Sequence, residues 1–283
     1  MAMQGAMTRI GIMQGRLTPP EDDRIQAFPR ESWRREFALA AEAGLDFIEW
    51  IFDLREGNAN PIANDEGIRE VAALSERHGV MIVSLCADYF MEKPLVRATE
   101  SELEERLATL EWLMYRCELL GIGRVVLPFV DSSRIESGEE MECVTRTLMR
   151  ALVTAEETGI EIHLETSLAP AAFSEMLSRL PHPRLKVNYD SGNSSALGYT
   201  PREEFASYGS RVGSVHIKDR KRRGDTVPLG TGDADFPALF ECLAEAGFSG
   251  DFTLQVARHR PGEERSWAER NRAFVLAHLS RGL

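Results

Sequence analysis

Residues 211–220 read RVGSVHIKDR, and the alternation of apolar and polar residues in this stretch predicts a β-strand. In the predicted strand, Val215 and Ile217 point to one side. His216 and Lys218 point to the other side. A strand that turns a histidine and a lysine toward the closed side of a sheet indicates a functional interior, because buried core strands are normally apolar there.

Three further strand-like runs end in polar side chains in the same way. The run IEIHLET contains Glu165, LKVNYD ends in Asp190, and FTLQV carries Gln255. If these strands lie beside the strand of His216, two carboxylates, an imidazole and an amide oxygen converge on one point. Such a set of donors predicts a site for a divalent metal ion.

The rest of the chain repeats one strand and one helix eight times. The strand-like runs are residues 8–13, 46–51, 80–85, 124–127, 160–165, 185–190, 212–217 and 251–256. A helix-like segment follows each run. Eight such units predict an α/β fold, a (β/α)8 TIM barrel, as a single domain over residues 8–283. Residues 1–7 are expected to be a tag or a disordered N-terminus.

In a TIM barrel the reacting groups lie at the carboxyl ends of the strands. Glu49 and Asp88 end the second and third strands, so both are expected at the mouth with Glu165 and Lys218. We expect the catalytic proton transfers to use these four residues. Glu49 and Asp88 also fit helix caps or loop ion pairs, and Lys218 also fits a structural partner of Asp219 or Glu165.

A second set of polar residues lies two positions earlier on the same inward faces. Its members are His163, Asn188, Ser214 and Thr253. Because the interiors of such barrels are usually filled by Val, Ile and Leu, this layer indicates hydrogen-bonding support for the metal ligands above it.

Composition excludes some classes of partner. The 283 residues carry 33 Lys and Arg against 45 Asp and Glu, a formal net charge of −12. Such a chain is expected not to bind nucleic acid, because it repels phosphate backbones. The four cysteines show no CxxC spacing, and there is neither a signal peptide nor a membrane-length apolar run. We therefore expect a cytoplasmic protein with no membrane partner.

Seven segments follow one another in a fixed order: GIMQGRL (11–17), FIEW (47–50), CADYF (86–90), NYDSGN (188–193), VHIKDR (215–220), PLGTGDADF (228–236) and FTLQVAR (252–258). Together they resemble the sugar phosphate isomerase/epimerase family. These xylose isomerase-like TIM barrels include ketose 3-epimerases, hexulose-phosphate epimerases and inosose dehydratases. The resemblance runs through nearly all of residues 8–280.

The resemblance implies one divalent ion held by side chains of strands five to eight. The corresponding positions are Glu165, Asp190, His216 and Gln255. Mn²⁺ or Mg²⁺ suits these donors best, with Co²⁺ and Zn²⁺ as alternatives. Family members carry a glutamate where this chain has Gln255.

That glutamate matters because, in the ketose 3-epimerases, it and the strand-five glutamate exchange the substrate proton on opposite faces. An amide can bind a metal through its oxygen but cannot take up a proton at neutral pH. A replacement base would then come from Glu165, Lys218, Glu49 or Asp88.

Polar and aromatic residues around the mouth are expected to bind the substrate. They are Gln14, Arg16, Trp50, Asn193 and Arg258. The backbone N–H groups of residues 230–232 favour a phosphate or another anion, although a tight loop would need the same glycines. For Trp50, packing in the core is the alternative.

The function predicted from these features is isomerisation or epimerisation of a small sugar, keto-sugar or sugar phosphate through an enediolate. An inosose dehydratase-like lyase is the first alternative. An AP endonuclease-like hydrolase would need further histidines for three zinc ions, and the chain lacks them near Asp190 and His216. A non-catalytic sugar binder is the last alternative. Relatives suggest a homo-oligomer, either a dimer or a tetramer.

Overall fold

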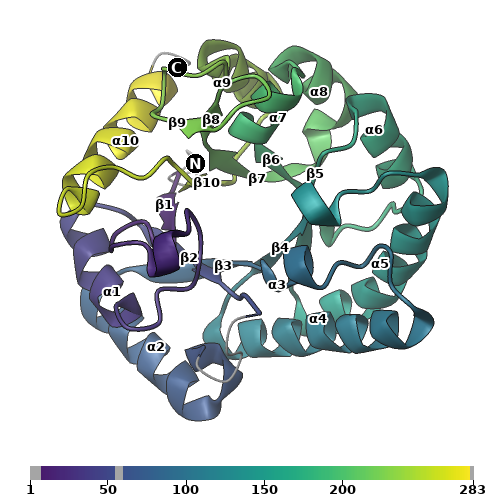
Figure 1. The fold of residues 1–283 in the computed structure, drawn as a ribbon, viewed down its shortest axis with the longest axis horizontal. Coiled ribbons are helices and arrows are strands. Elements are labelled where there is room, and N and C mark those ends of the chain that lie inside the picture. Colours follow the sequence, from purple (N-terminus) through teal and green to yellow (C-terminus); the bar gives the residue numbers. More distant parts are fainter. Residues whose placement is uncertain (1–7, 55–59, 281–283) are drawn as a thin grey trace, which may run out of the picture.

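The structure, a computed structural model, describes residues 8–54 and 60–280. Eight parallel strands close into a barrel in the order β1-β10-β7-β6-β5-β4-β3-β2, and helices surround it (Figure 1). The prediction of a TIM barrel is thereby confirmed. The segment expected to be a tag, residues 1–7, lies outside the described residues.

Each barrel strand overlaps one of the eight predicted runs. The strands are β1 (Ile10–Met13), β2 (Phe47–Ile51), β3 (Met81–Cys86), β4 (Arg124–Phe129), β5 (Glu161–Thr166), β6 (Leu185–Asp190), β7 (Val212–Ile217) and β10 (Asp251–Leu254). A small antiparallel hairpin, β8 (Asp219–Arg220) with β9 (Thr226–Val227), is inserted between the last two barrel strands.

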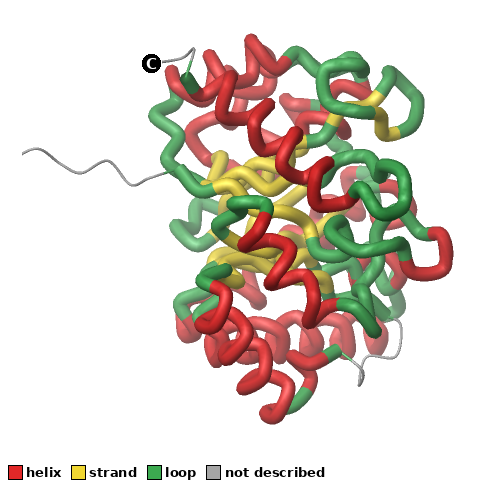
Figure 2. Tube along the Cα trace, turned by 90° about the vertical axis from the view of Figure 1, so that its left-hand side faces the viewer, coloured by secondary structure: helices red, strands yellow, loops and turns green. Residues whose placement is uncertain are grey.

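Helices cover the outside of the strands, as the side view shows (Figure 2). They are α1 (Trp33–Glu42), α2 (Asp65–His78), α3 (Tyr89–Glu92), α4 (Glu100–Leu120), α5 (Gly138–Thr158), α6 (Pro170–Ser178), α7 (Ser191–Leu197), α8 (Pro201–Tyr208), α9 (Phe236–Glu245) and α10 (Glu264–Leu279). Short 3-10 turns are η1 (Glu21–Asp23), η3 (Pro61–Ala63), η4 (Asp131–Ser133) and η5 (Gly209–Arg211). Within residues 8–54 and 60–280, every helix is too short or too polar to cross a lipid bilayer.

Local sequence explains where the clearest helix begins and ends. Thr99 and Glu102 form a capping box at the start of α4, which satisfies backbone N–H groups that lack partners inside the helix. Gly121 ends the helix at a φ of 69°, a left-handed conformation that glycine adopts without strain. Leu107, Leu110 and other buried side chains turn one face of α4 toward the barrel.

The register of the strands determines which side chains lie next to one another at the mouth. Asp190 pairs with His216 between β6 and β7, and Thr253 pairs with His216 between β7 and β10. Their sequence neighbours Tyr189 and Ile217 are buried on the opposite side, against the helices. Alternation along each strand therefore turns the predicted ligands inward at one end of the barrel.

Three members of the predicted second polar layer form a continuous network, whereas Thr253 lies beside His216 and donates to Glu49. His163 Nδ1 lies 2.7 Å from Ser214 Oγ, which donates to Asn188 Oδ1 at 2.7 Å. Asn188 Nδ2 then donates to Glu165 Oε2 at 2.9 Å. Each of these side chains is at least 95% buried. The layer therefore holds Glu165 from below, as the sequence indicated.

Candidate metal centre and active site

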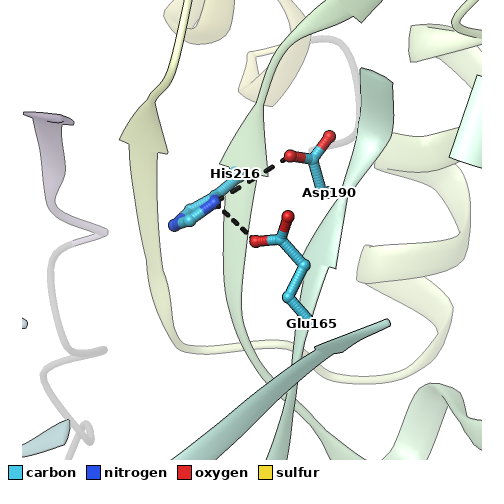
Figure 3. A group of neighbouring side chains, drawn as sticks. All are labelled: Glu165, Asp190 and His216. Atoms are coloured by element: carbon cyan, nitrogen blue, oxygen red, sulfur yellow. Dashed lines mark ion pairs between the residues drawn. The ribbon is translucent and has the colours of Figure 1, made fainter. Parts of the chain in front are cut away.

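Three side chains meet at the mouth of the barrel. Glu165, Asp190 and His216 come from the neighbouring strands β5, β6 and β7, and each offers a ligand atom within 4.8 Å of the other two (Figure 3). Nδ1 of His216 lies 3.1 Å from Glu165 Oε2 and 4.0 Å from Asp190 Oδ2. Two carboxylates and one imidazole nitrogen thus point at one small volume.

The ring of His216 is oriented from below by Glu49. Nε2 of His216 lies 2.6 Å from Glu49 Oε1, and both side chains are fully buried. Although burial opposes ionisation, the charge of His216 and its hydrogen bond lower the pKa of Glu49. An ionised carboxylate can only accept, so Nε2 carries a hydrogen. Glu49 therefore fixes the tautomer that leaves Nδ1 for a metal.

Nδ1 of His216 is a buried polar atom without a hydrogen bond in the described part of the chain. Burial alone would lower the pKa of His216, but the charges of Glu49 and Glu165 and the hydrogen bond to Glu49 raise it to about 10. The site therefore stabilises a positive charge. A ring nitrogen that makes no hydrogen bond of its own and faces two carboxylates fits a divalent cation.

The two carboxylates are held in place by amides. Asn188 Nδ2 donates to Oε2 of Glu165 at 2.9 Å, and Asn193 Nδ2 donates to Oε1 at 2.7 Å. Asp190 is the N-cap of α7, where its Oδ1 accepts from the backbone N–H of Asn193 at 2.7 Å. Carboxylates fixed in this way have little freedom left to lose when they bind an ion.

Gln255, the predicted fourth ligand, lies at the edge of this group, just after β10. Its Oε1 accepts a hydrogen bond from Lys218 Nζ at 3.0 Å. The same ammonium donates to Asp190 Oδ2 at 3.1 Å and to Asn193 Oδ1 at 3.2 Å. Gln255 as a metal ligand therefore stays a prediction, whereas its contact with Lys218 is part of the structure.

A cavity of about 840 Å³ opens above these residues. Its lining includes Arg16, Asp88, Glu165, Asn193, Lys218 and Gln255. Asp88 accepts from Gln26 Nε2 at 2.9 Å and from the Cys86 thiol at 3.1 Å. Burial raises the pKa of Asp88 to about 6, despite these hydrogen bonds. Besides Glu165, a candidate metal ligand, the cavity thus holds a carboxyl group that can exchange a proton near neutral pH.

The structure does not bring three of the predicted substrate-binding residues into this cavity. Trp50 is fully buried, and its ring lies 5.7 Å from the ring of Trp33. Gln14 is 1% exposed and accepts from the N–H of Ile51. Arg258 lines a separate hollow and holds the loop after β1 through the carbonyl oxygen atoms of residues 18 and 25. Only Arg16 and Asn193, of the five, line the cavity.

Glu49, named as a catalytic candidate, is 0% exposed and does not line the cavity either. It contacts His216 from below, so the structure gives it an orienting position. Glu165, Lys218 and Asp88 remain as the candidates that can touch a substrate.

The expected phosphate cradle at residues 230–232 is wrong. The N–H groups of Gly230, Gly232 and Ala234 all donate to the carboxylate of Asp219, at 2.8–3.1 Å. Asp219 is fully buried. Because a side chain of the protein itself takes these donors, they are closed to a phosphate group. Asp235, by contrast, is the N-cap of α9, and its side chain accepts from the N–H of Ala238.

Gln26 was missed by the sequence reasoning. It belongs to the long loop between β1 and α1, which has no periodicity to reveal it. This loop is anchored by the buried Glu36, which accepts from the N–H of Gly15 at 2.8 Å and of Leu17 at 3.1 Å. The loop thereby inserts Gln26 into the cavity lining beside Asp88.

Comparisons with known proteins give a consistent result. A family model described as xylose isomerase-like TIM barrel matches residues 37–277. An L-ribulose-5-phosphate 3-epimerase, UlaE from Salmonella heidelberg (strain SL476), is 24% identical over 262 residues, 88% of this chain and 91% of the relative.

Two solved structures share the fold. One is an L-ribulose 3-epimerase, with a TM-score of 0.77, 18% identity and coverage of 98% of this chain and 96% of the other. The second is the IOLI protein with a bound zinc atom, with a TM-score of 0.76, 18% identity and coverage of 98% and 99%.

Proposed function

The chain belongs to the xylose isomerase-like TIM barrel family, and from this premise we propose that it is a divalent-metal-dependent epimerase or isomerase of a small ketose or ketose phosphate. The observation that carries the proposal is that Nδ1 of His216, which makes no hydrogen bond in the described part of the chain, faces Glu165 and Asp190 at the mouth of the barrel. Relatives named as 3-epimerases of L-ribulose 5-phosphate and L-ribulose support the reaction class.

The residues that would hold the ion are Glu165, Asp190 and His216, with Gln255 as the proposed fourth. A bound divalent ion would polarise the substrate carbonyl and stabilise the negative charge of the enediolate. Mn²⁺ or Mg²⁺ is the ion we propose, and the zinc-bound IOLI structure keeps Zn²⁺ as an alternative.

The chain's own residues supply binding and proton transfer. Glu165 lines the cavity, and its carboxylate is fixed by Asn188 and Asn193, so it is the group we assign to removing the proton next to the carbonyl. Lys218 and Arg16 line the same cavity and provide positive charge for substrate oxygen atoms. We assign substrate binding to Arg16, Asn193 and Lys218.

The experiment is deuterium exchange in ²H₂O, after the protein has been stripped with a chelator and reloaded with Mn²⁺. We expect solvent deuterium at the carbon next to the carbonyl of a pentulose or its 5-phosphate, together with the epimer. We expect Glu165→Gln to lose this exchange. Mn²⁺ titration by calorimetry, expected to give one ion per chain, tests the metal site independently of turnover.

Other outcomes would change the assignment. Loss of water from the substrate would favour a dehydratase. Saturable sugar binding with no exchange at any carbon would favour a binding protein. Three tightly bound zinc ions together with cleavage of abasic DNA would favour a nuclease.

A further inference from the structure

Four side chains form a chain of hydrogen bonds across the cavity. Lys218 Nζ donates to Gln255 Oε1 at 3.0 Å, and Gln255 Nε2 donates to Gln26 Oε1 at 3.0 Å. Gln26 Nε2 donates to Asp88, at 2.9 Å to Oδ2 and 3.2 Å to Oδ1. The chain joins an ammonium beside Asp190 to a carboxyl group at the end of the third strand.

While Asp88 is ionised, the direction of every bond in this chain is fixed by its ends. The ammonium of Lys218 can only donate, so Gln255 must turn its oxygen toward it and its NH₂ group away. An ionised Asp88 can only accept, so Gln26 must turn its NH₂ group toward it. The two amides therefore have one common orientation. A glutamate at position 255 would place a carboxylate oxygen against Oε1 of Gln26, and a glutamate at position 26 would place one against Asp88. Neither pair could form a hydrogen bond.

This arrangement gives a physical reason for glutamine at position 255. A carboxylate there could not donate to Gln26, whose amide holds Asp88. With glutamine in place of glutamate at position 255, the site has one group fewer that can take up a proton, because an amide cannot exchange a proton at neutral pH. Asp88 lies one amide group away, at the other end of the same chain, and its carboxyl group faces the cavity.

Asp88 differs from the other carboxyl groups of the cavity lining. Glu92, Asp131 and Asp225 are exposed, and Asp53 accepts from the N–H of Phe28. Asp190 lies outside the lining and is held by Lys218 and by the N-terminus of α7. Asp88 is half-buried and, within residues 8–54 and 60–280, it accepts hydrogen bonds only from neutral groups. Its burial also raises its pKa to about 6, which leaves both protonation states accessible near neutral pH.

We propose that Asp88 is the second proton-transfer group of the reaction, in place of a carboxylate at position 255, and that Gln26 and Gln255 position it. This inference rests on the proposed epimerase function. Glu165 takes the carbon-bound proton from one face, and the electron pair of the C–H bond enters the enediolate. Asp88, as the acid, returns a proton to the same carbon from the opposite face.

The step balances over one turnover. Glu165 ends protonated and Asp88 ends ionised, and exchange with water restores both groups. In the reverse direction Asp88 removes the proton and Glu165 returns it. Each epimer is therefore deprotonated by a different carboxylate.

The test uses Asp88→Asn, loaded with Mn²⁺ and assayed in ²H₂O with each epimer separately. We expect this variant to lose deuterium exchange into one epimer only, which we call one-sided loss. We expect conversion between epimers to fall at least about 100-fold. Exchange into the epimer that Glu165 deprotonates should stay within about threefold of wild type, whereas exchange into the other epimer should be lost. Glu165→Gln should show the opposite pattern, and Asp88→Asn should bind Mn²⁺ as the wild type does.

Two further variants complete the test. Asp131→Asn removes the same charge from the same cavity without touching the chain, and its conversion rate should stay within about threefold. Gln26→Met should reproduce the one-sided loss more weakly, by about tenfold, whereas general damage to the fold would lower exchange of both epimers equally.

The inference is overturned if Asp88→Asn converts the epimers within threefold of wild type, or if it loses exchange into both of them equally. In either case exchange by the wild type leaves the proposed epimerase function intact. An absence of exchange in the wild type overturns both.

Discussion

Metal binding at the barrel mouth is expected to release a proton from His216, and Glu49→Gln is expected to suppress that release. In the metal-free protein Glu49 and Glu165 outweigh burial and raise the pKa of His216 to about 10. Its Nδ1 therefore carries a proton at pH 7.5. Because a metal binds the unprotonated nitrogen, that proton must leave first.

The size of the effect follows from the pKa. Removing the proton at pH 7.5 from a group of pKa about 10 costs about 3 kcal/mol. The affinity for Mn²⁺ should accordingly rise about tenfold for each pH unit between pH 7 and 8.5. In Glu49→Gln the amide oxygen still accepts from Nε2, so the ring keeps its orientation. The lost charge lowers the pKa of His216, so most of this cost disappears at pH 7.5 and the affinity for Mn²⁺ should depend only weakly on pH.

Calorimetric titration with Mn²⁺ at pH 7.5, in two buffers of different ionisation enthalpy, measures the protons released. We expect about one proton per ion for the wild type and less than about half a proton for Glu49→Gln. Thermal unfolding of both metal-free proteins controls for damage to the fold. The reasoning is refuted if the wild type releases no proton, or if Glu49→Gln releases as many protons as the wild type.

Three further substitutions test other parts of the site. Gln255→Glu should tighten Mn²⁺ binding about tenfold through its added charge. It should slow epimerisation at least tenfold, because a carboxylate cannot donate to Gln26. Faster epimerisation would contradict this expectation. Gly192→Ala would place a Cβ 2.6 Å from Cγ of Lys218, so kcat/KM should fall about tenfold, and unchanged kinetics would exclude a role for that packing. Asp219→Asn leaves at least one buried N–H without an acceptor, which should cost about 2 kcal/mol and lower Tm by about 4–8 °C in a thermal scan. An unchanged Tm would show that water replaces the lost acceptor.

The position of Trp50 could have been predicted from the alternation of side chains along its strand. Glu49 and Trp50 are adjacent in β2, so only one of them can point into the barrel. Glu49 does, and it reaches His216. Trp50 therefore had to face the helices, where it packs against Trp33 of α1. A residue at a strand end lines the mouth only if its side chain also points inward, and successive side chains of a strand alternate between the two sides.

Local sequence patterns were enough to predict the eight strands, their inward faces and the three converging candidate ligands, because neighbouring residues set side-chain direction and strand ends. Tertiary structure alone decided which inward faces meet. Closure of the barrel brings Glu49 under His216, although the two residues are 167 positions apart in the sequence. Loops have no periodicity, so neither the insertion of Gln26 beside Asp88 nor the capture of the N–H groups of Gly230 and Gly232 by Asp219 could be predicted. Both depend on contacts between distant segments, which form only once the barrel has closed.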